Sequence, residues 1–172
     1  MEISIKFDKS GSLLTNPMKF ERNASAGINK ILINSGNYIL GQLQKNTPVG
    51  ATGVMRRNWY LETSRIGINY LVEVEVKNIT DYLDTVNSGR KAAPISRDGM
   101  KSLLLWVQRK LKITDYKKAI SISFAIAKTK KKKDTKGQRF VEDTLDVSLP
   151  IATQRILIPG IQEAVEDASN QD

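Results

Sequence analysis

TPVGATGVMRRNW, residues 47–59, is the stretch that decides the fold, because it contains residues that stop a helix and start a strand. Pro48 disfavours helical backbone angles at Thr47, so a preceding helix is expected to end near Lys45. Gly53 then permits a tight turn. The stretch therefore predicts a helix on its N-terminal side and a sheet on its C-terminal side.

A long helix is predicted before this stretch. Residues that can form one buried stripe recur there at three- and four-residue steps: Ile28, Ile31, Leu32, Ser35, Ile39 and Leu43. Asn16 is suited to the N-cap, and Pro17 to the first helical position, where its missing N–H costs nothing. We expect one helix from Pro17 to about Lys45.

Strands are predicted by alternation of apolar and polar residues. Residues 68–77 alternate almost throughout, and residues 59–63 alternate more weakly, with a turn expected at 64–67. A further strand is expected at 2–7. The sequence thus predicts a β-hairpin directly after the decisive stretch.

The second half of the chain is predicted to be mainly helical. A short helix or turn is expected at 81–89, followed by a basic loop at 90–94. Apolar residues at helical spacing define an amphipathic helix at 100–111, and either Ser96 or Asp98 is placed to cap it.

A third helix is expected after a cap at Thr114 or Asp115. It contains the string ISISFAI, residues 120–126, whose β-branched residues also allow a strand. A basic loop at 128–139 follows this segment.

The C-terminal segment is predicted to be helical at 151–168, with a bend at Pro159 and a disordered tail at 169–172. The length of 172 residues and the hydrophobic content of 40% are those of one domain with a sizeable core. We therefore expect residues 1–172 to form a single domain.

The chain offers no constellation for catalysis. It has no cysteine and no histidine, which removes thiolate sites, the commonest general base and the usual metal ligand. Phosphate-binding glycine loops and nucleophile motifs are absent as well. Glu73 and Glu75 share one strand face, and Asp81 and Asp84 lie near a turn, where carboxylates commonly face solvent. We expect a non-enzymatic protein with no cofactor, no metal and no small-molecule substrate.

Charge is distributed unevenly along the chain. The net charge is +9, yet residues 97–139 alone carry 14 Lys/Arg against 3 Asp/Glu, so the rest of the chain sums to −2. From Phe140 onward one Arg stands against seven acidic residues. Opposite charge on separate segments is suited to self-assembly. A signal peptide and a membrane span are not evident, so a soluble, cytoplasmic protein is expected.

The basic loop at 128–139 admits three interpretations. Clustered lysines attract phosphate and release counterions, which favours nucleic-acid binding. The lysine run contains no aromatic residue for base stacking, which favours a solvated, mobile loop tip. Contact with an acidic neighbouring subunit is the third interpretation, and all three stay open at this point.

The order of residues in the 47–59 stretch resembles the helix-end signature of the bacteriophage tail-completion family, whose members are also described as neck, minor capsid or tail-component proteins. That signature reads T-P-V, a short turn, T-G, a variable pair, R-R and a residue before Trp. Three later blocks resemble further stretches of the family in the same order: Y-x-x-x-V-x-x-G-R at 82–90, the P-I, W-V and K-L helix at 94–111, and F-A-I-A followed by G-x-x-F at 124–140. Two departures are Gly50-Ala51, where the turn usually has an acidic residue, and Asn87, where an acidic residue is frequent.

Members of that family are structural subunits that assemble as rings, commonly hexameric, which join the DNA-filled head to the tail tube or close the upper end of the tail. The resemblance implies an α+β fold, with a long N-terminal helix packed on a small antiparallel sheet and additional helices in the second half. It implies contact with other copies, with neighbouring neck, head-completion, tail-tube or tail-terminator proteins, and non-specifically with DNA in the channel. It places the protein in the virion at the head-tail junction, after assembly in the host cytoplasm, without a membrane.

Cations are the candidate contact residues under this resemblance. Arg56 and Arg57 are the preferred pair, holding an acidic neighbour or facing the DNA channel, although two solvated strand residues would give the same pattern. The full set of candidate assembly or DNA-channel contacts is Arg56, Arg57, Arg90, Lys130, Lys131, Lys132, Lys133, Lys136 and Arg139. The competing function is a basic nucleic-acid-binding protein that acts outside the particle.

Overall fold

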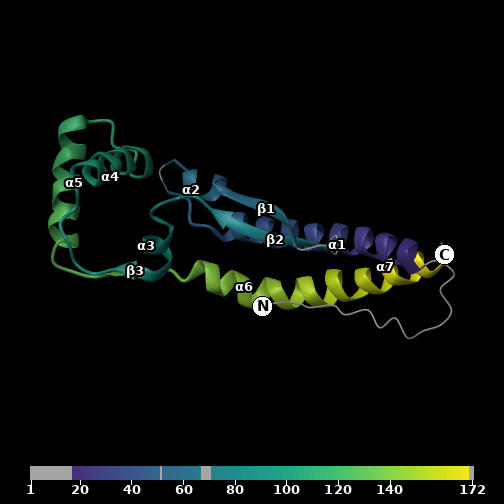
Figure 1. Ribbon diagram of the computed structural model, residues 1–172. Helices are drawn as coiled ribbons and strands as arrows, with labels where there is room; N and C mark the ends of the chain where they lie inside the picture. Colours follow the sequence, from purple (N-terminus) through teal and green to yellow (C-terminus); the bar gives the residue numbers. More distant parts are fainter. Residues whose placement is uncertain (1–16, 51, 67–70, 171–172) are drawn as a thin grey trace. The chain divides into compact units, whose positions relative to one another are not determined.

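The computed structural model describes residues 17–50, 52–66 and 71–170 (Figure 1). It has the predicted α+β class, with a long first helix, a two-stranded antiparallel sheet and more helices in the second half. The elements in chain order are α1 (Pro17–Asn46), α2 (Val54–Arg57), β1 (Trp59–Ile66), β2 (Leu71–Asn78), α3 (Leu83–Ser88), β3 (Gly89–Arg90), α4 (Arg97–Lys110), α5 (Tyr116–Lys130), β4 (Thr135–Lys136), α6 (Phe140–Ala152), a π-helical turn (Thr153–Leu157) and α7 (Ile158–Asn170). No helix among these described residues is long and apolar enough to cross a membrane.

Several boundaries follow the sequence patterns. Helix α1 begins at Pro17 and ends at Asn46, one residue after Lys45, as the proline signals predict. Strand β1 continues to Ile66, so the turn predicted to begin at Ser64 starts too early. Four parts of the prediction lie outside the described residues: the strand at 2–7, the N-cap at Asn16, strand residues 68–70 and tail residues 171–172.

Two compact units make up the chain, and each is assembled from separate segments. The first contains the described residues up to Tyr38, Glu62–Glu75 and the segment from Pro150 onward. The second contains Ile39–Leu61 and Val76–Leu149. Helices and strands pass from one unit to the other, so neither unit is one continuous stretch. The expectation of a single domain stays a prediction.

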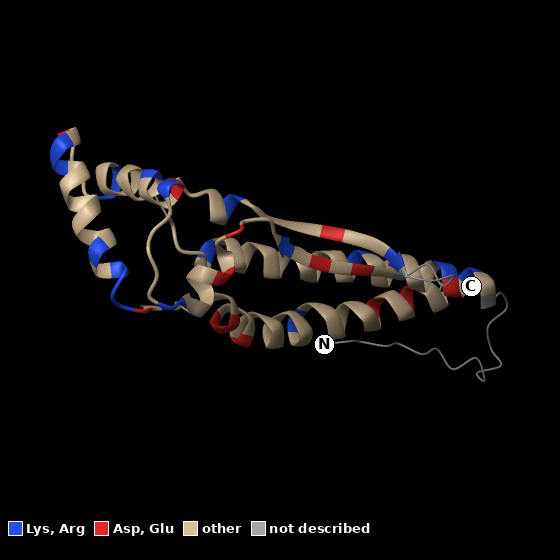
Figure 2. Cartoon of the chain, turned by 60° about the vertical axis from the view of Figure 1, so that its left-hand side comes forward, with Lys and Arg blue, Asp and Glu red and all other residues tan. Residues whose placement is uncertain are grey.

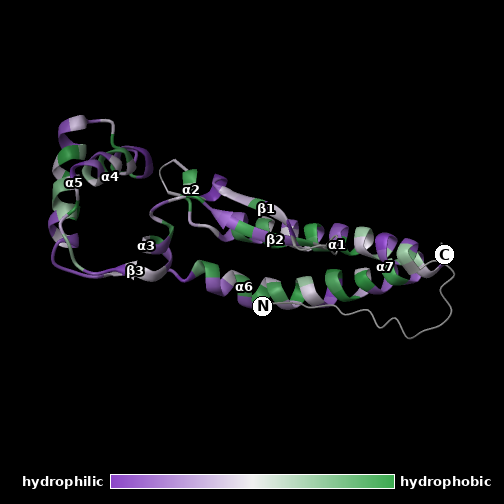
Figure 3. Ribbon diagram, viewed as in Figure 1, coloured by the Kyte–Doolittle hydropathy of each residue, from purple (hydrophilic) through white to green (hydrophobic). Residues whose placement is uncertain are grey.

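Close approach of α1 and α7 forms the core of the first unit. The contact is made by small residues: a Cβ added to Gly27 would lie 2.6 Å from the Cβ of Ala164. A Cβ added to Gly160 would lie 3.0 Å from the side chain of Ile31. Because the α7 partner number falls as the α1 number rises, the two helices run antiparallel. Hydrophobic residues recur along both helices (Figure 3).

Strand β2 is tied to α1 in the same unit, because the backbone N–H of Val72 donates to Oδ1 of Asn29 at 3.0 Å. A polar contact therefore holds this strand to the helix.

A cluster of buried apolar side chains forms the core of the second unit. Leu43, Met55, Trp59 and Phe140 come from the end of α1, from α2, from the start of β1 and from the start of α6. Partly buried residues from β2, α3 and α6 pack around them. Segments far apart in sequence therefore meet next to the 47–59 stretch.

Helices α4 and α5 pack against each other. Oγ of Ser96 accepts from the N–H of Gly99 at 3.1 Å, which makes Ser96 and not Asp98 the cap of α4. Oδ1 of Asp115 accepts from the N–H of Lys117 at 2.9 Å, which makes Asp115 and not Thr114 the cap of α5. The ISISFAI string is helical, and its small residue Ser123 is buried.

The two predicted basic loops pair with each other through short strands. Gly89 lies opposite Lys136, and Arg90 lies opposite Thr135, in an antiparallel pair of β3 and β4. The expectation of a loop at 128–139 is therefore corrected in part, because residues 128–130 belong to α5 and residues 135–136 to β4. A pairing of two residues on each side leaves no alternation that a sequence pattern can reveal.

The C-terminal helical region begins at Phe140, well before the predicted start at Ile151. Its buried face repeats every four residues: Phe140, Thr144, Ser148 and Ala152. Two of these residues are polar, which hid the stripe from a search for apolar periodicity. Pro159, where a bend was expected, lies in α7, and a π-helical turn at Thr153–Leu157 precedes this helix. Helix α7 includes Ser169 and Asn170, where a disordered tail was expected.

The contact of Gly27 with Ala164 leads to a stability prediction. A glycine inside a helix is ordinarily less stable than alanine, yet Gly27→Ala is expected to destabilise the protein by about 1–3 kcal/mol, because its Cβ overlaps that of Ala164. Gly41→Ala in the same helix is the matched control. A Cβ there meets nothing within 4 Å, so a gain of about 0.5–1 kcal/mol is expected. Urea unfolding of both variants measures the difference, and equal gains would contradict close packing of α1 on α7.

Candidate functional site

Thr47 is the centre of the 47–59 stretch and is fully buried. Its backbone N–H and its hydroxyl both donate to the carbonyl of Leu43, at 2.9 and 2.5 Å. Its Oγ1 in turn accepts from the indole Nε1 of Trp59 at 2.7 Å. The last turn of α1 and the first residue of β1 are thereby joined by one buried hydroxyl. This hydrogen bond explains physically why Thr47 and Trp59 occur together in the 47–59 stretch.

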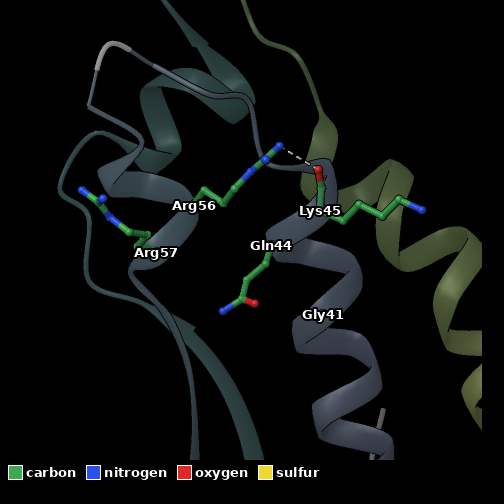
Figure 4. Close-up of a pocket in the computed structure, with 5 residues that line it drawn as sticks. All are labelled: Gly41, Gln44, Lys45, Arg56 and Arg57. Carbon is green, nitrogen blue, oxygen red and sulfur yellow. Dashed lines mark hydrogen bonds between the residues drawn. The ribbon is translucent and has the colours of Figure 1, made fainter.

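Arg56 closes the end of α1. Its Nη2 donates to the carbonyl of Lys45 at 2.9 Å and to the carbonyl of Thr47 at 3.1 Å, and Figure 4 shows the contact with Lys45. Carbonyls in the last turn of a helix have no partner within the helix and carry partial negative charge. The guanidinium donates hydrogen bonds to these carbonyls and places a positive charge beside them. Arg56 is therefore a positioning residue of the fold.

Arg57 is the more exposed member of the cation pair. Its Nη2 donates to the carbonyl of Thr52 at 3.0 Å, and its guanidinium points away from the end of α1 (Figure 4). Both arginines line an open pocket of about 500 Å³ together with Gly41, Gln44 and Lys45. None of the five lining residues is acidic. The pocket can therefore receive an anionic group such as a carboxylate or a phosphate.

The remaining candidate cations lie around the pair of β3 and β4. Arg90 donates through Nη2 to the carbonyl of Ala93 at 2.7 Å, and Nζ of Lys130 donates to Oγ1 of Thr135 at 3.2 Å. These two cations contribute to local structure. The exposed members of the set are Lys131, Lys132, Lys133, Lys136 and Arg139, and Figure 2 shows the blue segments of this region.

This basic segment is held in place by more than its strand. Oδ1 of Asp134 accepts from the backbone N–H of Ala92 at 2.7 Å, and the loop returns through β4 to the start of α6. The solvated loop tip that sequence allowed is therefore anchored at several points. The structure brings Arg56 and Arg57 together with Lys45. The sequence prediction did not include Lys45 among the candidate contacts, although its position two residues before Thr47 was an available signal.

A second feature missed in sequence is the contact between Asn87 and Glu142. The side-chain amide of buried Asn87 donates to both carboxylate oxygens of Glu142, each at 2.9 Å, and its Oδ1 accepts from the N–H of Val141 at 3.0 Å. An acidic residue at position 87 would face Glu142 with like charge. The choice of an uncharged amide at position 87 thus has a local cause.

Glu142 is held in its charged form. Its pKa is lowered, first by a hydrogen bond from its own backbone N–H, then by the amide of Asn87 and last by the charge of Arg139, while desolvation acts in the opposite direction. A carboxyl group with a lowered pKa is poorly suited to proton transfer near neutral pH. Glu142 therefore serves to join α3 to α6.

Acidic residues do not assemble into a metal site in the part of the chain that the structure describes, where no group of three or more potential ligands lies close together. Glu73 and Glu75 are exposed on β2, as predicted, and Oε2 of Glu73 accepts from the hydroxyl of Ser64 at 3.2 Å. Asp81 and Asp84 are also exposed.

Comparison of the chain with models of protein families, with curated proteins and with solved structures finds no match. The resemblance to the tail-completion family therefore rests on the residues of the chain alone.

The two arginines are expected to differ in their effect on stability. Arg56→Met leaves the carbonyls of Lys45 and Thr47 without this donor, and we expect a loss of about 1–3 kcal/mol. Arg57→Met is the matched control and should change stability by no more than about 0.5 kcal/mol. Denaturant unfolding compares the two variants, and equal losses would rule out the separate role given to Arg56.

The lowered pKa of Glu142 leads to a pH dependence. A carboxyl group whose pKa is lower in the folded state adds stability above its unfolded pKa, and this stability is lost as pH falls through the folded pKa. The wild-type protein should therefore exceed Glu142→Gln in stability at pH 7, with a gap in stability that narrows as pH falls through the folded pKa of Glu142. In an Asn87→Ala background the gap should be smaller at every pH. Thermal unfolding across pH measures it, and a pH-independent gap would contradict the assignment.

Proposed function

We propose that the chain is a structural virion protein of a bacteriophage neck, forming a ring that joins the head connector to the tail or closes the top of the tail tube. The observation that carries this proposal is the 47–59 stretch, followed in order by three further blocks that resemble the same family. The α+β architecture with its long first helix is also the one that the resemblance implies.

The geometry of the 47–59 stretch supports a division of roles within the R-R pair. Arg56 holds the end of α1, together with the buried bond between Thr47 and Trp59. Arg57 and Lys45 remain exposed at the pocket. We assign these two cations to contact with an acidic neighbouring subunit, because a guanidinium matches the geometry of a carboxylate.

The proposed partners are other copies of the chain in a hexameric ring, and neighbouring neck, head-completion, tail-tube or tail-terminator proteins. The exposed cations around β4 are assigned to an adjoining ring or to DNA in the channel, where non-specific contact with phosphate needs charge and no base reading. The proposed location is the head-tail junction of a virion assembled in the host cytoplasm.

Electron microscopy of the parent particle tests this function. Gold-labelled antibody against the chain should bind at the head-tail junction, and the purified protein should show rings. Monomers without virion association would overturn the proposal. In a particle that lacks the wild-type chain, Lys45→Glu with Arg57→Glu should leave heads and tails unjoined, because both changes place negative charge against an acidic partner. Lys30→Glu, a charge reversal at an exposed position elsewhere on α1, is the control and should restore joined particles.

A nucleic-acid-binding protein acting outside the particle is the second candidate, and the exposed cations around β4 favour it. Gel-shift assays over a range of salt concentrations separate the two functions. Tight binding by a monomer, with a steep dependence on salt, would favour this candidate over the neck protein.

A further inference from the structure

Helices α4 and α5 expose a groove with apolar walls. Met100 and Leu104 of α4 face Ile120 and Phe124 of α5 across a space of about 340 Å³, which we name the hairpin groove. The side chain of Phe124 is 63% exposed. An apolar groove that remains open to water on a folded protein is typical of a surface that another molecule covers.

The charge around the hairpin groove limits what can cover it. Residues 97–130 carry nine Lys/Arg against two Asp, a balance of +7 (Figure 2). Arg97 and Lys101 line the groove itself. Lys101 makes an ion pair with Asp98 at 3.0 Å, but both side chains are largely exposed, so this pair is weak and exchangeable. The occupant should therefore present an apolar side chain between acidic ones.

Helix α6 has such a surface. Asp143, Asp146 and Val147 lie three and four residues apart, on one face of the helix, and all three are exposed. The side chain of Val147 is 64% exposed, and Phe140 and Thr144 occupy the buried face. We name this surface the acidic stripe. It is opposite in charge to the hairpin groove and presents an apolar side chain beside two carboxylates.

We propose that the hairpin groove of one copy binds the acidic stripe of a second copy of the chain. Val147 of the second copy enters the groove against Phe124, and Asp143 and Asp146 of that copy pair with Arg97 and Lys101. Both surfaces are exposed within a single chain, so each is available to a second copy. This proposal rests on the proposed function, in which copies of the chain assemble, and it names the two surfaces through which they meet. The two surfaces differ, so a copy that uses its groove in one contact still has its stripe for another copy. The contact can therefore repeat from copy to copy.

Sedimentation velocity of charge-reversed full-length variants tests this contact. Asp143→Lys with Asp146→Lys, and separately Arg97→Glu with Lys101→Glu, should each weaken self-association about tenfold or more, and added salt should weaken the wild type. An equimolar mixture of the two variants should associate again as mixed complexes. The unchanged groove of the stripe variant fits the unchanged stripe of the groove variant, and the reversed groove and reversed stripe are also complementary in charge. Glu166→Lys with Asp167→Lys on α7 has the same charge change as the stripe variant and should associate as the wild type does.

Several outcomes would overturn the contact. It is overturned if both reversals leave self-association unchanged, or if the mixture forms no mixed complexes. It is also overturned if the wild-type chain is monomeric at every salt concentration. Loss of DNA binding in the groove variant, with self-association intact, would assign the groove to nucleic acid instead. Circular dichroism of each variant checks that it is folded, and Val147→Ser, which keeps the charge, should also weaken association.

The fate of this contact can be told apart from that of the neck function. If gold labels the head-tail junction and the charge-reversed variants self-associate as the wild type does, the neck function is supported and the contact is overturned. Mixed complexes formed by the two variants, with no association of the chain with a virion, would support the contact and overturn the neck function.

Discussion

The hydrogen bond from the indole of Trp59 to the hydroxyl of Thr47 is the constraint on which the second unit depends. Both side chains are buried, so leaving either polar group without a partner would cost about 1–3 kcal/mol. The bond fixes the residue at which α1 stops, and this places the free carbonyls beside Arg56 and sets Trp59 against Leu43 and Met55 in the core. Helix end, strand start and core are thus determined together.

A polar residue also joins elements at the other side of the same unit. Asn87 accepts from and donates to the first turn of α6 through its side chain, while its carbonyl accepts from the N–H of Arg139 at 2.8 Å. The backbones approach closely there: a Cβ on Gly137 would lie 2.3 Å from the carbonyl oxygen of Asn87. Apolar burial supplies the bulk of the stabilisation, and these satisfied polar groups select one arrangement of the segments.

Local signals in the sequence predicted local structure well. Proline marked both ends of α1, and the α+β class followed from one long helical pattern and one alternating segment. The early start of α6 was missed because Thr144 and Ser148 occupy buried positions that usually hold apolar residues. The separate roles of Arg56 and Arg57 could not be predicted, because adjacent cations look alike until the carbonyls that one of them caps are placed beside it.

The π-helical turn at Thr153–Leu157 changes the spacing of buried residues along the C-terminal helices. Buried positions Ala152 and Leu157 are five residues apart, whereas an α-helix returns to the same face after three or four. The wider π-helical turn accommodates one extra residue, so that α7 continues with Ala164 facing Gly27. Removing one residue from this turn would leave the four-residue spacing of a regular α-helix, whereas removing one inside α7 would rotate every later residue by about 100°. Loss of one residue should therefore be less damaging at this turn than inside α7, and natural variation in length is expected here sooner than in the regular helix that follows.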